Sequence, residues 1–258
     1  LRNPKHASLA YILVQRSTVL VGVLQFHRKG EALPEVEVPD WPKDRMHYVQ
    51  ALQALRCFDT AGVSDEDRKR TGMYVSERKR RALKQTVVSV DGWFARLQTR
   101  VSVSILNDAN VARATQLLNR TNQMNLRTRR LSEAELKAWS QEKDRSVWVF
   151  RVADAFGDSG ICGLAGLDVN DGVAEVSDFV LSCRVMGRGV EATMLHVMTD
   201  YVHKNDLLEV RAIYERTLRN EPCYAFFVES RWSRQGDTFI WRDGVFAKPE
   251  YVEVISDE

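Results

Sequence analysis

The chain has 258 residues, of which 44% are hydrophobic and 28% charged, with only 14 Gly and 6 Pro. This composition excludes a disordered, collagen-like or low-complexity protein and is typical of a globular chain with one large or two modest domains. The net charge is +2 but unevenly divided, since residues 1–98 carry 17 Lys and Arg against 11 Asp and Glu while the remainder is acidic.

Membrane and metal functions find no support in the sequence. The longest apolar stretch, residues 9–26, is interrupted by Arg16 and Ser17 and falls short of the roughly 20 residues that span a bilayer. The four cysteines stand far apart without a CxxC pair, which argues against a zinc site or a disulfide scaffold and favours a reducing cytoplasm. They are Cys57, Cys162, Cys183 and Cys223.

The first hundred residues predict two buried strands followed by helices. The apolar, β-branched runs at residues 9–15 and 18–26 are typical of strands covered on both faces. A loop rich in Pro and acidic residues comes next, and residues 44–58 have apolar side chains at helical spacing. Ser64, with three acidic residues after it, predicts the start of a helix that runs through Ala82, and a short element over 87–98 leads into the next domain.

From Val101 onward the pattern alternates between strands and helices. A strand over 101–106 precedes a helix that Asp108 or Asn110 can cap, and Ser132 with Glu135 forms a capping box for a second helix. Three strands joined by Asp, Gly and Asn turns then predict an antiparallel meander: 147–154, 160–169 and 174–182. The remaining expected elements are a helix over 190–203, a strand over 208–215, a helix from Pro222 to Glu229, and strands over 237–241 and 245–254. This order predicts an α+β domain with a mostly antiparallel sheet.

Two basic runs stand out in the predicted helix between Ser64 and Ala82: Arg68-Lys69-Arg70 and Arg78-Lys79-Arg80-Arg81. They form either a solvated helix face or a docking surface for an acidic partner such as a carrier protein. Nucleic acid is disfavoured, because the whole chain is nearly neutral and no aromatic residues interleave with these runs.

The segment DFVLSCRVMGRGVE, residues 178–191, predicts an anion site. A strand ends, the pattern Arg-x-x-Gly-x-Gly follows, and a helix begins. Gly187 and Gly189 let the backbone approach a ligand, whose phosphate oxygens the N–H groups at the helix start can bind, while Arg184 and Arg188 can add charge.

This order of strand, loop and helix resembles the acetyltransferase superfamily known as GNAT. In that superfamily the loop holds the pyrophosphate of coenzyme A, and the splayed strand before it pairs with the pantetheine arm. A second signature of that superfamily has a match at Asn220, Cys223 and Phe227, although Phe227 can equally be a core residue. The resemblance implies a site for coenzyme A, or for a carrier-bound phosphopantetheine, at Phe179, Val180, Leu181, Arg184, Val185, Gly187, Arg188, Gly189, Val190, Asn220 and Phe227.

The text LLNRTNQMNLRTRR at residues 117–130, together with 178–191, resembles the FkbH-like family. Its members pair a haloacid-dehalogenase-type phosphatase domain (subfamily IIIC) with a GNAT-like domain, and they load a glyceryl unit on an acyl carrier protein for polyketide extender units. The resemblance extends from about residue 32 to 241. It implies a divergent phosphatase remnant over 1–35, a helical linker over 36–98 and a GNAT-like acyltransferase domain over 99–258.

The phosphatase half departs from the family pattern. The expected strands over 9–15 and 18–26 carry no Asp-x-Asp motif, and no Asp occurs between Val19 and Gly30. Because phosphoryl transfer of this kind needs a carboxylate nucleophile and carboxylates on Mg²⁺, we expect no phosphatase activity and no metal.

Four residues are candidates for acyl-transfer chemistry. Glu175 and Asp178 are possible general bases; three apart on a strand, they should face opposite ways, so that only one meets the substrate. Tyr224 is a candidate acid, and Cys183 either carries an acyl group as a thiolate or is inert.

Three functions therefore stay open: an acyltransferase working on the phosphopantetheine thioester of a carrier protein, a non-catalytic carrier-docking module, and a coenzyme A-dependent N-acetyltransferase.

Overall fold

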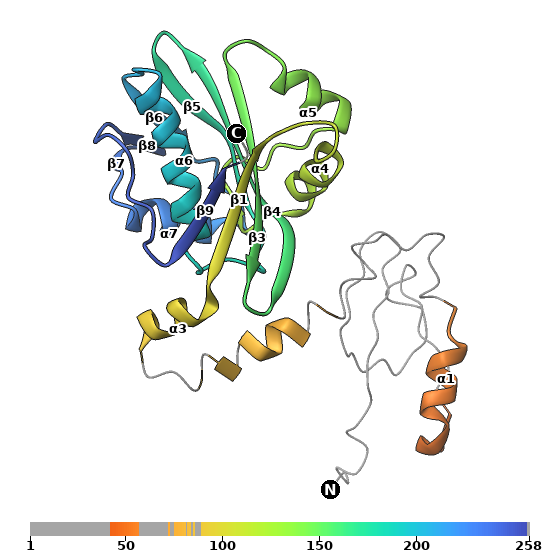
Figure 1. Ribbon diagram of the computed structural model, residues 1–258. Helices are drawn as coiled ribbons and strands as arrows, with labels where there is room; N and C mark the ends of the chain where they lie inside the picture. Colours follow the sequence, from red (N-terminus) through yellow and green to blue (C-terminus); the bar gives the residue numbers. More distant parts are fainter. Residues whose placement is uncertain are drawn as a thin grey trace, which may run out of the picture. The chain divides into compact units, whose positions relative to one another are not determined.

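The computed structural model describes residues 42–56, 72, 75–80, 82–83, 85 and 89–256 (Figure 1). The chain divides into two compact units, residues 1–68 and 69–258. Several sequence predictions lie outside the described residues: the strands over 9–15 and 18–26, the helix start at Ser64, the basic run 68–70, Arg81 and Cys57.

The described part of the first unit is a short helical element. A 3₁₀ turn, η1 (Arg45–His47), leads into α1 (Tyr48–Ala54). The Asp44 carboxylate begins it by accepting a hydrogen bond from the Met46 N–H at 3.0 Å, as N-cap residues do. The helix expected over 44–58 is thus confirmed in its centre, and extended backbone at Leu55 ends it.

One mixed sheet lies at the centre of the second unit. Its strands are β1 (Thr99–Ile105), β2 (Met124–Asn125), β3 (Arg145–Asp154), β4 (Gly157–Asn170), β5 (Val173–Leu181), β6 (Glu209–Ile213), β7 (Ser233–Gln235), β8 (Thr238–Trp241) and β9 (Val252–Ser256). Among the described residues the order is β7-β8-β6-β5-β4-β3-β1-β9, with β2 beside β5. All pairs are antiparallel except β1 with β9 and β5 with β6. This is the mixed, mostly antiparallel arrangement that the sequence predicts, including the β3-β4-β5 meander.

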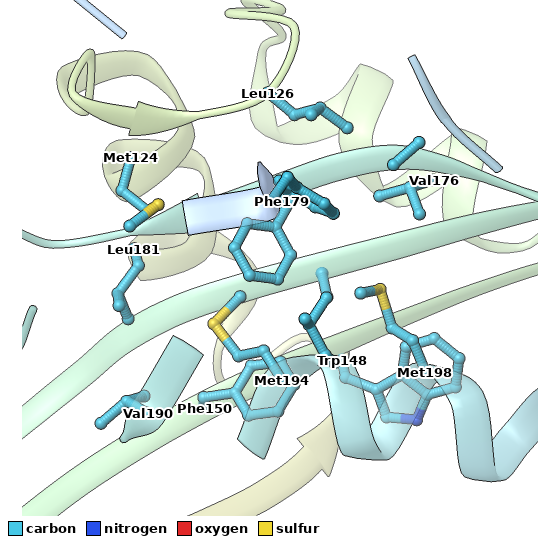
Figure 2. Close-up of a cluster of buried hydrophobic side chains, with 14 of the residues drawn as sticks. Met124, Leu126, Trp148, Phe150, Val176, Phe179, Leu181, Val190, Met194 and Met198 are labelled. Atoms are coloured by element: carbon cyan, nitrogen blue, oxygen red, sulfur yellow. The ribbon is translucent and has the colours of Figure 1, made fainter. Parts of the chain in front are cut away.

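Helices cover both faces of this sheet (Figure 1). On one face, α4 (Val111–Arg120) and α5 (Glu133–Ser140) pack in a cluster that contains Leu117 and Leu136. On the other, α6 (Val190–Lys204) and α7 (Glu221–Glu229) pack in a larger cluster around Phe150 and Phe179 (Figure 2). The expected capping box of α5 is present: Ser132 accepts from the Glu135 N–H, and the Glu135 carboxylate accepts from the Ser132 N–H.

The C-terminal strand is shorter than expected. β9 begins at Val252, which pairs with Thr99 at the start of β1, whereas the sequence predicts a strand from residue 245. Residues 242–251 form an irregular segment that contains Pro249, which has no N–H to donate to a ladder. This segment runs across the start of α6, and it therefore matters for the site.

An upstream helical segment belongs to the second unit. Residues 75–80 are helical, and the Ser76 hydroxyl donates to the Phe156 carbonyl at 2.9 Å. Arg80 is buried and donates to both oxygens of Asp154, at 2.6 and 3.0 Å. Arg80 therefore belongs neither to a solvated helix face nor to a docking surface. Arg78 and Lys79, the other described members of the second basic run, are exposed. The structure also groups this part of the expected linker with the sheet domain.

In the ranges that the structure describes, no helix is both long enough and apolar enough to cross a membrane.

Candidate functional site

The loop between β5 and α6 has the backbone form that the sequence predicts. Gly187 and Gly189 have φ angles of +71° and +81°, a left-handed conformation that favours glycine. At Gly187 a Cβ would meet nothing within 4 Å, so the loop is open there. At Gly189 a Cβ would lie 2.9 Å from Tyr251 and 3.0 Å from Pro249. A glycine is therefore needed at position 189, because a side chain there would clash with the chain's own C-terminal segment.

The two arginines of the loop do not converge on an anion. Arg188 is buried, and its guanidinium bonds Asp154 at 3.1 Å, Glu77 at 3.1 Å and the Arg184 carbonyl. The side chain of Arg188, a predicted phosphate contact, is held in a buried ion cluster with Arg80, Asp154 and Glu77. The Arg184 guanidinium donates to the Ser182 hydroxyl at 3.3 Å, within its own loop.

Glu191, in the first turn of α6, occupies the place expected for a ligand. Its carboxylate accepts the N–H of Gly187, one of the donors that a phosphate would use. Burial raises the pKa of Glu191, opposed by the hydrogen bonds from the Gly187 and Glu191 N–H groups and by the charge of Arg188. Sequence reasoning missed this residue, although an acidic side chain two residues after the last glycine was the available signal.

The outer edge of β5 is already paired. Parallel pairing with β6 covers only Val173–Glu175, so the two strands diverge beyond that point. There β2 takes the place of β6: Met124 pairs with Leu181, Asn125 with Val180, and the Leu126 N–H donates to the Phe179 carbonyl at 3.2 Å. Figure 2 shows Met124 beside Leu181. A segment of the same chain thus pairs with the edge at which the sequence predicts a pantetheine arm.

The side chains assigned to that edge are core residues. Phe179 and Leu181 lie in the cluster under α6 and α7, Val180 lies in the cluster under α4 and α5, and Val185 and Val190 are fully buried. They position the loop and offer no side chain to a ligand.

Asn220 and Phe227 also have structural roles. Asn220 is fully buried; its Nδ2 donates to the Asn125 and Glu215 carbonyls at 3.0 and 2.9 Å. Its Oδ1 accepts from the Tyr214 hydroxyl and the Thr217 N–H, each at 2.8 Å. All its hydrogen-bonding capacity is used to join β2 to the turn between β6 and α7. The Asn220 side chain, an expected cofactor contact, therefore makes all its hydrogen bonds within the chain. Phe227 is a buried core residue, the alternative that the sequence left open, and its ring centroid lies 5.2 Å from that of Phe179 and 5.3 Å from that of Phe239.

Glu175 and Asp178 face the same side of the sheet, contrary to the prediction from strand alternation. The register shifts between Gly166 and Leu167, which leaves Ser177 as the extra residue of a β-bulge. Each carboxylate is paired with an arginine from the segment after β2: Glu175 with Arg127 at 2.6 Å, and Asp178 with Arg129. Both candidate bases are thus held in ion pairs, on the face of α4 and α5.

Tyr224 and Cys183 lie apart from these carboxylates. The Tyr224 hydroxyl accepts a hydrogen bond from Arg234, and its ring packs against Tyr214. Cys183 is an exposed free thiol at the start of the loop, whereas Cys162 and Cys223 are buried. The structure does not bring the four catalytic candidates together.

A groove of about 450 Å³ opens between the start of α6 and α7. Its walls are mostly apolar, with Phe94 from α3 (Val90–Leu97), Met124, Ala225, Phe226 and Tyr251 among them. The Phe94 and Tyr251 rings stack at 4.1 Å. Its charged lining residues are Glu191 and Glu229. The volume lies within the range of small-molecule sites, about 300–1,000 Å³.

Coenzyme A fits these residues only in part. The groove can accept a neutral, flexible arm, since its walls are apolar and carry few polar groups. The loop offers a pyrophosphate neither the Gly187 N–H, which the Glu191 carboxylate takes, nor the Arg188 guanidinium, which lies in the ion cluster. We therefore derive no step through bound coenzyme A.

Comparison with solved structures finds N-acetyltransferases at low identity. The ribosomal-protein-S18-alanine N-acetyltransferase of Escherichia coli is 12% identical over 58% of this chain and 97% of its own, with a TM-score of 0.40. A spermidine N-acetyltransferase of Vibrio cholerae, in complex with CoA and spermine, is 17% identical over 57% and 90%, with a TM-score of 0.41. The PaiA N-acetyltransferase of Thermoplasma acidophilum, in complex with coenzyme A, is 16% identical over 54% and 96%, with a TM-score of 0.39.

Neither the family models nor the curated proteins give a match to this chain.

Proposed function

We propose that the sheet domain is an acyl-handling module that holds the pantetheine arm of an acyl thioester in the groove between α6 and α7. The observation that supports this is the groove itself, which is mostly apolar, about 450 Å³ in volume and lined by residues of β2, α6 and α7. A pantetheine arm is a long, uncharged chain with two amides, and such a chain matches apolar walls that carry few polar groups.

The residues of the groove have separate roles in this proposal. Phe226 and Met124 supply apolar contact along the arm, and the stacked rings of Phe94 and Tyr251 form a wall. Burial raises the pKa of the Tyr251 hydroxyl, with Glu191 and Asp91 adding to the effect, so that this hydroxyl stays protonated and can donate to an amide carbonyl.

The carrier and the acyl unit in this proposal are taken from the FkbH-like resemblance. In this proposal an acyl carrier protein presents the arm and a small glyceryl-type acyl unit is handled on it, in polyketide extender-unit synthesis in the cytoplasm. Because Glu175 and Asp178 are held in ion pairs on the other face of the sheet, the domain binds the thioester without using them as bases. Docking of the arm without transfer is the outcome that these ion pairs favour.

Coenzyme A-dependent N-acetylation is the second candidate. It is supported by the divergence of β5 from β6 directly before a glycine-opened helix, the arrangement that the sequence led us to expect for coenzyme A. The solved neighbours named above are N-acetyltransferases, which agrees with this candidate in fold. Transfer of a radiolabelled acetyl group from acetyl-CoA to an amine, at a rate above that from acetyl-pantetheine, favours it over the carrier-linked function.

The experiment measures binding of acetyl-pantetheine to the full chain by calorimetry. Ala225 is exposed and lines the groove, so Ala225→Trp places an indole in the path of the arm and should weaken binding at least tenfold. Ala134 is also an exposed helical alanine, on α5 away from the groove, and Ala134→Trp is the matched control that should change affinity less than twofold. Equal affinity in the wild type and Ala225→Trp contradicts the proposal.

A further inference from the structure

The groove contains acidic side chains where a nucleotide-bearing arm needs positive charge. Glu191 lies at the start of α6 and Glu229 at the end of α7, and both line the groove. No Lys or Arg side chain is among its described lining residues. A ligand with a phosphate inside this groove would meet carboxylates and no compensating cation, which is unfavourable in a partly buried site.

The start of α6 would be the remaining source of positive potential, since helix N-termini present free N–H groups. In this chain two of the donors around this helix start are already engaged. Glu191 accepts from the Gly187 N–H and from its own N–H, and its residue is only 6% exposed. The carboxylate therefore acts as an internal substitute for a bound anion, and it is held in place by a helix that packs in the main core through Val190 and Met194.

The loop arginine that would offset this carboxylate is fixed elsewhere. Arg188 makes two ion pairs, with Asp154 and Glu77, at 3.1 Å each. Turning it toward the groove would leave Asp154 with Arg80 alone and would break the contact to the helical residues 75–80. The rearrangement that would create a phosphate site is therefore opposed by a buried cluster.

Accordingly, we propose that Glu191 is a specificity-determining residue that restricts the groove to the uncharged part of a pantetheine arm and excludes the pyrophosphate of coenzyme A. This inference rests on the proposed function and adds its substrate class: a thioester arm whose phosphate stays outside the groove, as on a carrier, in preference to a nucleotide-linked one.

The test compares three probes on the full chain at pH 8 by calorimetry: pantetheine, 4′-phosphopantetheine and coenzyme A. The wild type should bind pantetheine at least fivefold more tightly than coenzyme A. Glu191→Ala removes the carboxylate and frees its N–H donors, so coenzyme A and 4′-phosphopantetheine should gain at least tenfold in affinity while pantetheine changes less than twofold. Glu191→Gln keeps an acceptor for the Gly187 N–H without the charge, and it should shift affinity in the same direction if the alanine variant does not fold.

The matched control is Glu221→Gln, an exposed carboxylate in the first turn of α7 that does not line the groove. It should leave all three affinities within twofold. Wild-type affinity for coenzyme A equal to or above that for pantetheine overturns the inference while leaving the proposed function in place. So does an unchanged affinity for coenzyme A in the folded Glu191 variants. Absence of binding by all three probes instead refutes the proposed function, and the inference with it.

Discussion

Glu191 combines burial with a negative charge at a helix start. Helix N-termini favour carboxylates, and this one accepts two backbone N–H groups, but burial is the largest influence and raises its pKa. A carboxyl whose pKa is raised on folding gives stability that is fully present below its unfolded pKa, about 4.3, and that is lost as pH rises through the folded value.

Glu191→Gln should therefore become increasingly stabilising, relative to the wild type, as pH rises. The amide keeps an oxygen for the Gly187 N–H and has no proton to lose. Melting temperatures of the two proteins should differ least near pH 4.5 and most near pH 8, with the variant higher at the upper end. Arg188 and Tyr251, the neighbouring titratable groups, are present in both proteins. A difference that stays constant, or that narrows with rising pH, contradicts the assignment.

The conformation of a single residue was predictable from sequence where the backbone alone determines it. The contacts of a side chain were less predictable, because they depend on partners distant in sequence. The left-handed conformation of Gly187 and Gly189 follows from their position between a strand and a helix. The destination of Arg188 does not, because its partners Glu77 and Asp154 are 111 and 34 residues away in sequence. The common face of Glu175 and Asp178 depends on a one-residue bulge at Ser177, which strand alternation does not reveal.

At the scale of elements, β2 is the feature that changes the site. Two residues are too few to show a period, so the strand could not be read from the sequence. Elements with strong local signals were predicted correctly. Among them are α5, whose capping box marks its start, and the β3-β4-β5 meander. Two polar side chains brace the segment around β2: the Asn125 Oδ1 accepts from the Thr128 N–H at 2.7 Å, and Arg129 pairs with Asp178.

The attachment of β2 depends on Asn220. Asn220→Ala removes four hydrogen bonds. One of them is the buried hydrogen bond from Asn220 to the Asn125 carbonyl of β2. We expect a loss of about 2–3 kcal/mol in the free energy of unfolding, measured by urea denaturation.

Asn205→Ala is the control for this prediction, because Asn205 is exposed and its side chain donates one hydrogen bond, to the Tyr201 carbonyl at 2.8 Å. Its cost should stay below about 1 kcal/mol. Equal losses in the two variants would mean that Asn220 does not clamp β2.

At the scale of the whole second unit, the structure joins parts that the sequence separates. The FkbH-like resemblance implies a boundary between a linker over 36–98 and a domain over 99–258, whereas residues 69–98 fall in the same compact unit as the sheet. The connection is a buried ion cluster in which Asp154, at the end of β3, receives both Arg80 and Arg188. Such long-range pairs leave no trace in local sequence pattern, since each member looks like an ordinary surface charge. The helical residues 75–80 and the loop before α6 thus share one carboxylate.

Asp154→Asn tests whether this cluster holds the unit together. The Asp154 side chain is 1% exposed, and its replacement leaves two buried guanidinium groups with Glu77 as their remaining acid in the cluster. Removing one partner of a buried ion pair costs about 3–5 kcal/mol, so the free energy of unfolding should fall by at least ~3 kcal/mol.

Asp158→Asn alters an exposed pair with Arg151 in the same β3–β4 hairpin and should cost less than about 1 kcal/mol. Because Arg188 belongs to the loop before α6, Asp154→Asn should also speed proteolysis at that loop. Urea denaturation and limited proteolysis on both variants measure these effects, and a loss in Asp154→Asn no larger than in Asp158→Asn would show that the cluster contributes no more than a surface pair.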